Sequence, residues 1–351
     1  MAGLGRHLLA GAAIILATIF SVLPASAEAV PGGKCENVAG ISLDELIASC
    51  NSVIDSGAPG SAAVVSAHIM RAKAYREKGD LEKTIFDYTV VIKLQPANEY
   101  AYRCRGEAHF SNGQFDLAIA DLNTAIQLEP GRQYAYYVRG FVYIAKTDLG
   151  LAIEDFSQAI RIDPKYTGAY FGRATAYKNS RDYGHAIEDY DRVIELDRGS
   201  ARALRARGIA NLQAGSLGKS VADLSQSSAQ DTNNANTALW LDIARKRNGL
   251  PSQLPERTSA LDMSKWPAPI IRLFLGEITW EAVVVAADDA DPKTKKGQVC
   301  EANFFIGELA LQNGMREEAR RRFELAAADC PKTFSEWQAA NVELRAMDTN
   351  P

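Results

Sequence analysis

The stretch EYAYRCRGEAHFSNGQFDLAIADLNTAIQLEP, residues 99–130, has the same layout as QYAYYVRGFVYIAKTDLGLAIEDFSQAIRIDP, residues 133–164. Each stretch has two halves in which apolar residues recur at helical spacing, separated by a short turn. In the first stretch the turn is Asn112-Gly113, and Pro130 ends the second half. Equivalent residues lie 34 positions apart. The sequence therefore predicts a row of antiparallel helix pairs, one pair per period.

The same period runs without insertion from about residue 65 to residue 232 and is marked by arginines and aspartates. Each aspartate follows its arginine by sixteen residues. The pairs are Arg71 and Asp87, Arg105 and Asp121, Arg139 and Asp155, Arg173 and Asp189, and Arg207 and Asp223. Equivalent residues of a repeat stack are separated by a whole repeat, so the aspartates cannot converge on one metal ion. We expect each aspartate to pair with its own arginine and to have a structural role.

Composition and motifs narrow the possible functions. The chain has 351 residues, 47% of them hydrophobic and 23% charged, with a net charge of -4. This is the composition of a globular protein, and no basic patch of the kind that binds nucleic acid is present. The sequence has no zinc, phosphate-loop or nucleophile motif. It therefore predicts a protein that is not an enzyme and that has no metal and no cofactor.

The first 27 residues have the pattern of a secretory signal. Arg6 and His7 precede an apolar run over residues 8–23, which Ala25-Ser26-Ala27 follows as a cleavage pattern. The run is shorter than the ~20 residues of a membrane span. We expect cleavage after Ala27 and an exported, soluble chain with no transmembrane anchor. An uncleaved anchor is the alternative interpretation.

Export permits disulfides, and the sequence has five cysteines. Cys300 and Cys330 flank one helical hairpin, in which the start of the first helix and the end of the second are neighbours. Cys35 and Cys50 lie close together near the mature N-terminus. We predict one disulfide within each of these two pairs. Cys104 has no local partner and is predicted to be a buried, free cysteine.

The repeat period and the stretches that interrupt it divide the chain into five predicted segments. A further repeat-like hairpin is expected near the end, because Gly307, Gly314 and Pro331 stand at the same offsets as Gly106, Gly113 and Pro130. The predicted segments are a signal peptide (1–27), an arm and helix with a disulfide (28–64), five repeats with a capping helix (65–249), a linker (250–265) and a helical region with the extra hairpin (266–351).

Residues 65–249 resemble tetratricopeptide repeat (TPR) proteins. The forms Arg105-Gly106 and Asp155-Phe156 are similar to those of exported repeat proteins of proteobacteria. The stretch CEANFFIG at 300–307, with Trp266 upstream, resembles the end of NlpI-type periplasmic lipoproteins, although this chain lacks their lipidated N-terminal cysteine. The resemblance implies an all-α, right-handed superhelical solenoid of antiparallel helix pairs. It also implies an adaptor for envelope proteases and peptidoglycan hydrolases.

In such a solenoid the first helix of each pair faces the concave side, so its non-core positions are expected to line a binding groove. Aromatic residues and arginine are enriched at binding hot spots. Packing of some of these aromatics against neighbouring repeats is the alternative. The predicted groove residues are Lys73, Arg76, Tyr100, Arg103, Phe110, Tyr134, Tyr137, Phe141, Phe171, Lys178, Arg202 and Arg205.

These observations predict a non-catalytic periplasmic scaffold or adaptor. Its expected partners are other proteins or extended peptides of the cell envelope, not nucleic acid. One alternative is a binding protein for cell-wall glycan or peptide fragments. Another is an enzyme whose active site lies within residues 250–350.

Overall fold

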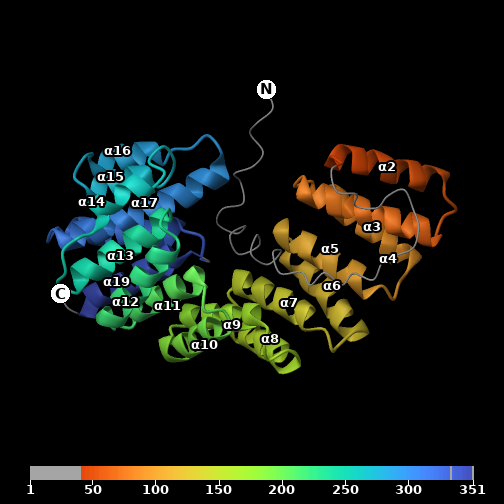
Figure 1. Cartoon of the computed structure of the whole chain (residues 1–351), viewed down its shortest axis with the longest axis horizontal. Helices are drawn as coiled ribbons and strands as arrows, with labels where there is room; N and C mark the ends of the chain where they lie inside the picture. Colours follow the sequence, from red (N-terminus) through yellow and green to blue (C-terminus); the bar gives the residue numbers. More distant parts are fainter. Residues whose placement is uncertain (1–40, 333, 350–351) are drawn as a thin grey trace. The chain divides into compact units, whose positions relative to one another are not determined.

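The computed structural model describes residues 41–332 and 334–349, which are helical and contain no strand (Figure 1). The predicted signal peptide and Cys35 lie outside the described residues. The chain divides at Gly172 and Arg173 into two compact units, each treated by itself. We call residues 41–172 the amino-terminal unit and residues 173–349 the carboxy-terminal unit. None of the described helices is long and apolar enough to cross a membrane.

The amino-terminal unit has one helix followed by successive helical hairpins, which confirms the predicted all-α repeat architecture. Consecutive helices between residues 43 and 162 pack against one another. The helices are α2 (Leu43–Ser56), α3 (Ala62–Glu77), α4 (Leu81–Leu94), α5 (Glu99–Ser111), α6 (Phe115–Leu128), α7 (Gln133–Lys146), α8 (Leu149–Ile162) and the first turns of α9 (Thr167–Asn179).

The carboxy-terminal unit continues the hairpins and then adds shorter helices and a final hairpin. Its helices after α9 are α10 (Tyr183–Leu196), α11 (Ala201–Gln213), α12 (Leu217–Gln230), α13 (Ala235–Arg247), α14 (Leu254–Arg257), η1 (Thr258–Ala260), α15 (Ala268–Phe274), α16 (Trp280–Ala286), α17 (Pro292–Gln312), α18 (Arg316–Asp329) and α19 (Ser335–Thr349). The predicted repeat-like hairpin is α17–α18.

Local sequence sets where these helices begin and end. The Asn98 side chain caps α5 by accepting a hydrogen bond from the Ala101 backbone N–H, at 3.0 Å. The turn after α5 needs a left-handed residue, and Gly113 supplies it with φ of +75°. The equivalent turn after α7 uses Thr147, with φ of +67°. A side chain in this conformation costs about 1 to 2 kcal/mol, so this turn is made against local preference.

The predicted pairing of arginine with aspartate is confirmed. Arg139 donates from Nε and Nη2 to the two oxygens of Asp155, at 2.8 and 2.6 Å. Its third nitrogen, Nη1, donates to Asn123 on the second helix of the preceding repeat. Arg105 makes the same link to Thr89, at 3.0 Å. Each of these arginines therefore joins two consecutive repeats.

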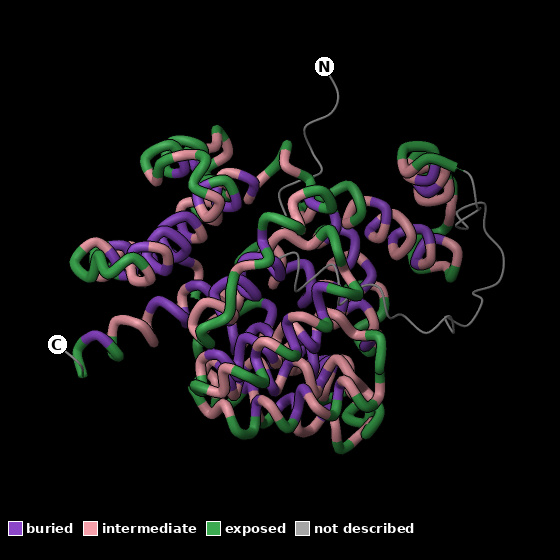
Figure 2. Tube along the Cα trace, turned by 60° about the vertical axis from the view of Figure 1, so that its left-hand side comes forward, coloured by how far each residue is buried: buried purple, intermediate pink, exposed green. Residues whose placement is uncertain are grey.

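One hydrophobic core cluster of the carboxy-terminal unit includes residues from Ile209 to Met347. Figure 2 shows buried positions recurring along the helices and exposed positions at many of the turns. Leu254 and Leu261, from the segment expected to be a linker, are part of this core. Helix α13 was expected to cap an exposed end of the repeats. Instead Trp240 of α13 packs on Phe304 of α17, with ring centroids 5.1 Å apart, so α13 is an internal helix.

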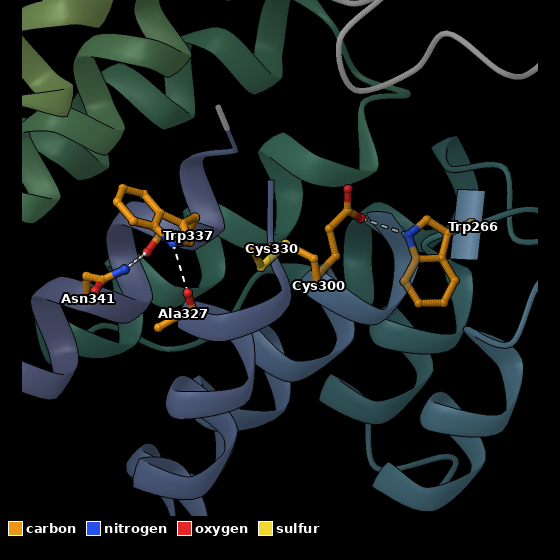
Figure 3. The surroundings of a disulfide bond; sticks show 7 residues. Trp266, Cys300, Ala327, Cys330, Trp337 and Asn341 are labelled. Atoms are coloured by element: carbon orange, nitrogen blue, oxygen red, sulfur yellow. Dashed lines mark hydrogen bonds between the residues drawn. A yellow bond between two sulfur atoms is a disulfide. The ribbon is translucent and has the colours of Figure 1, made fainter. Parts of the chain in front are cut away.

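The predicted disulfide between Cys300 and Cys330 joins α17 to the end of α18 (Figure 3). The Cα atoms of the two cysteines are 4.8 Å apart. Beside it, Trp337 of α19 donates from Nε1 to the Ala327 carbonyl oxygen, at 3.0 Å. Cys104 is buried and forms no disulfide. The end of α18 is thus fixed a few residues before α19 begins.

Candidate functional site

The predicted groove residues fall on the first helices of the repeats in both units. Nine lie in the amino-terminal unit: Lys73, Arg76, Tyr100, Arg103, Phe110, Tyr134, Tyr137, Phe141 and Phe171. Three lie in the carboxy-terminal unit: Lys178, Arg202 and Arg205. Their exposure decides which of them can contact a partner.

Tyr137 and Phe141 belong to the protein interior, which corrects their assignment as contact residues. Their exposed fractions are 6% and 4%. The two rings are 5.0 Å apart, and Phe141 packs 5.1 Å from the fully buried Phe156 of α8. The reason is the close approach of α7 and α8 at Gly140, where an added Cβ would lie 2.8 Å from Phe156 Cζ. The Phe156 ring fills this space and holds both aromatics inside.

Tyr100, Arg103 and Tyr134 come together on the first-helix face of α5 and α7. The Arg103 guanidinium lies between the two rings, 5.0 Å from the Tyr100 centroid and 4.9 Å from that of Tyr134. All three side chains are half-buried. A cation stacked between aromatic faces gains about 0.5 to 2 kcal/mol per contact, depending on solvation. This arrangement fixes the orientation of Arg103.

Two buried glutamates complete this cluster and were not predicted from the sequence. Arg103 donates to Glu99 at 3.1 Å and to Glu107 at 3.2 Å, one turn away on either side along α5. Arg76 of α3 reaches the other oxygen of Glu107, at 3.5 Å. Burial raises the pKa of Glu107, against the opposing effect of the two arginines. The sequence signal for these contacts is that Glu99 and Glu107 lie four residues before and four residues after Arg103, a spacing at which side chains of one helix meet.

Lys73 adds a third cation to this cluster, which we call the arginine–tyrosine cluster (Lys73, Arg76, Glu99, Tyr100, Arg103, Glu107 and Tyr134). Its Nζ lies 5.4 Å from the Tyr100 ring centroid. Burial lowers the pKa of Lys73, and Arg76 and Arg103 lower it further. Among the described residues, no carboxylate forms an ion pair with Lys73. The cluster therefore contains three cationic side chains and two carboxylates.

The other predicted residues lie outside this cluster. Phe110 is half-buried and packs on Phe115 across its own hairpin, with ring centroids 6.0 Å apart. Phe171 and Arg202 are half-buried. Lys178 is only 7% exposed, and its Nζ donates to Ser335 Oγ of α19 at 3.4 Å. Its assignment as an open groove residue is therefore corrected, because α19 covers it.

The described ranges 41–332 and 334–349 contain no group of three or more histidine, cysteine, aspartate or glutamate side chains that could hold a metal ion. The chemistry of the arginine–tyrosine cluster is instead that of recognition. It offers aromatic faces, oriented guanidinium groups and the Lys73 ammonium group, which has no ion-pair partner in the described part of the chain, and these suit a carboxylate or a polar peptide.

Two family profiles described as tetratricopeptide repeat match the chain, one over residues 65–98 and the other over 105–167 and 171–235. These ranges coincide with the hairpins and the arginine–aspartate period. The chain is a tetratricopeptide repeat protein. TPR proteins are generally non-catalytic scaffolds for proteins or peptides, and neither profile is that of an enzyme family.

Solved TPR structures resemble this one. A tetratricopeptide repeat protein from Parabacteroides merdae is 15% identical, with a TM-score of 0.54 over 76% of this chain and 93% of that one. PilW, described as a widely conserved type IV pilus biogenesis factor, is 17% identical, with a TM-score of 0.52 over 58% of this chain and 94% of its own. YrrB, described as a TPR protein with an unusual peptide-binding site, is also 17% identical, with a TM-score of 0.44 over 54% and 95%. At these identities the likeness concerns the fold.

Proposed function

We propose that this TPR protein is a non-catalytic scaffold of the cell envelope that holds a partner protein through the arginine–tyrosine cluster. The observation that carries the proposal is the excess of cations in the cluster, with Lys73 unpaired beside Tyr100. The partner is an extended or helical peptide segment with an exposed carboxylate. That carboxylate would pair with Lys73 while the rest of the segment packs on the tyrosine rings. Envelope proteases and peptidoglycan hydrolases are the partner class that the NlpI-type resemblance favours.

The geometry supports a carboxylate ligand over a cationic one for an electrostatic reason. Arg76 and Arg103 are already engaged with Glu107, so their charges are largely balanced within the cluster. Lys73 is partly desolvated and has no carboxylate partner among the residues that the structure describes, and a ligand carboxylate would offset the cost of desolvation. Charge pairs of this kind contribute mainly to specificity and to the rate of association.

Lys73→Glu is expected to weaken capture of the envelope partner at least tenfold, because it replaces the Lys73 cation with a negative charge that repels the partner's carboxylate. The measurement is a pull-down from an envelope fraction with mass spectrometry, followed by titration of the captured protein. Lys93→Glu is the matched control, since Lys93 is exposed on the second helix α4. Equal loss in both variants, or none in either, would count against the cluster as the site. Enrichment of glycan fragments instead of a protein would favour the alternative function.

The envelope location depends on removal of the predicted signal peptide after Ala27. Protein recovered from the periplasm is expected to begin at Glu28, as N-terminal sequencing would determine. Recovery of the chain in membranes with Met1 intact would contradict export as a soluble protein. Protein recovered from the cytoplasm with its signal peptide intact would contradict the proposal that the partners are envelope proteins.

A further inference from the structure

The C-terminal helix α19 lies on the first-helix face of the repeats in the carboxy-terminal unit. At its start, Ser335 contacts Lys178 and Gln338 hydrogen-bonds to Asn179, both at the end of α9. Further along, Glu343 accepts from Arg247 Nη1 of α13, at 2.8 Å. Helix α19 thus covers part of the first-helix face of the repeats in this unit.

Comparison of equivalent repeat positions shows which charged group α19 adds to this face. Lys178 and Arg205 stand three 34-residue periods after Arg76 and Arg103, the two arginines that hold Glu107. The position equivalent to Glu107 is Ile209, which has no charge. From outside the repeats, Ser335 at the start of α19 accepts a hydrogen bond from Lys178, and the next residue, Glu336, acts electrostatically on Lys178 and, together with Asp231, on Arg205. Glu336 is 5% exposed.

The polar contacts beneath α19 are incompletely matched. The Oε1 atom of the buried Gln338 has no hydrogen-bond partner within residues 41–332 and 334–349. Lys178, buried beside it, makes one long hydrogen bond to a hydroxyl group, and burial lowers its pKa to about 8. Burial also raises the pKa of Glu336. Unmatched buried polar groups cost free energy, so the docked position of α19 is weaker than its buried area alone would give.

A covalent tether keeps α19 close to this face in spite of that cost. Cys330, fixed to Cys300, lies five residues before Ser335, and Trp337 is hydrogen-bonded to Ala327 of α18 (Figure 3). A short tether gives a segment a high effective concentration at its site, so weak contacts are enough to hold it there. The same contacts without a tether would be easily displaced.

We propose that α19 is an exchangeable internal ligand, and that the face formed by α9, α11 and α13 is a second binding site, for an acidic helical segment of a partner protein. The recognised group is a carboxylate near the start of that helix, placed where it attracts Lys178 and Arg205. This site lies in the other unit from the arginine–tyrosine cluster and needs no envelope partner for its test. A negative result at this second site would therefore not contradict the proposed function. A negative result for the arginine–tyrosine cluster would likewise not contradict the second site.

The test uses the full chain and a fluorescent peptide of residues 335–349. Glu336→Lys places a third cation beside Lys178 and Arg205 and is expected to release α19. The variant should bind the peptide at least tenfold more tightly than the original chain in fluorescence anisotropy. Asp348→Lys is the matched control, because Asp348 is exposed at the far end of α19, and should behave like the original chain. Adding Lys178→Met and Arg205→Met to the Glu336→Lys chain should abolish peptide binding.

Hydrogen exchange on the unaltered chain provides a second readout that does not depend on the variants folding. Helix α19 should exchange at least tenfold faster than α17 and α18, because it opens locally. Exchange of all three helices at one common rate would overturn the proposal, since α19 would then be a permanent part of the core. A folded Glu336→Lys chain that binds the peptide no better than the original would overturn it as well.

Discussion

Phe156→Ala is expected to destabilise the amino-terminal unit by about 3 to 5 kcal/mol, the usual cost of removing a buried phenylalanine. The Phe156 ring is fully buried and packs on Phe141 and Tyr137, at 5.1 and 6.1 Å between centroids. It also occupies the space left by Gly140 and Gly172, so α7 and α8 cannot close over the cavity without moving backbone. The measurement is urea unfolding, with circular dichroism as the signal.

Phe86→Ala is the control for this substitution. Phe86 is 62% exposed on α4, so its loss should change stability by no more than about 0.5 kcal/mol. Similar stability losses in the two variants would contradict the assignment of Phe156 to the core. The same reasoning means that alanine at Tyr137 and Phe141 would be expected to test folding and not partner contact.

Asp155→Ala is expected to cost about 3 to 5 kcal/mol, because it leaves Arg139 without its bidentate partner. Both side chains are largely buried, and Arg139 would keep its hydrogen bond to Asn123 and its contacts with the Tyr136 and Tyr143 rings but no carboxylate partner. Burial raises the pKa of Asp155 in spite of Arg139, which indicates that desolvation of the pair is expensive. The damage therefore comes from the stranded charge and not from the loss of a strongly favourable pair. Thermal or urea unfolding would measure it.

Two further variants separate these causes. Asp116→Ala removes an exposed pair with Lys146 and should cost at most about 1 kcal/mol. Arg139→Met combined with Asp155→Leu removes both charges and should recover most of the stability lost in Asp155→Ala. Partner capture should survive in Asp155→Ala at temperatures where it remains folded. Unchanged melting with lost binding would assign the pair to a functional surface instead.

Much of the fold could be predicted from the sequence because its determinants are local. A helical hairpin is specified within one 34-residue period by its turn, its apolar spacing and its proline. The pairing of Arg139 with Asp155 follows from the same period, since the two residues belong to adjacent helices of one hairpin. The disulfide between Cys300 and Cys330 was predictable for that reason too.

The candidate site was less predictable. The repeat period gives the place of a residue on its helix, but it does not give the side chains that pack against that residue. Tyr137 and Phe141 stand one 34-residue period after Arg103 and Glu107. Tyr137 and Phe141 are buried aromatic residues, whereas Arg103 and Glu107 carry charge. The difference arises across the hairpin, where Phe156 takes the place of Leu122. The covering of Lys178 by α19 depends on residues more than 150 positions apart, and no periodic signal marks such a contact.

The arginines that bridge consecutive repeats have a consequence for how the amino-terminal unit unfolds. Because Arg105 holds Asp121 in its own repeat and Thr89 in the one before, fraying the preceding repeat leaves one guanidinium N–H of Arg105 without its acceptor. In a linear array with nearest-neighbour interfaces, such a coupling penalises every boundary between a folded and an unfolded repeat. Partly melted arrays are then rare, and the unit loses its hairpins in one cooperative step. Cooperativity along the array thus depends on hydrogen bonds donated by the paired arginines as well as on apolar packing between neighbouring repeats.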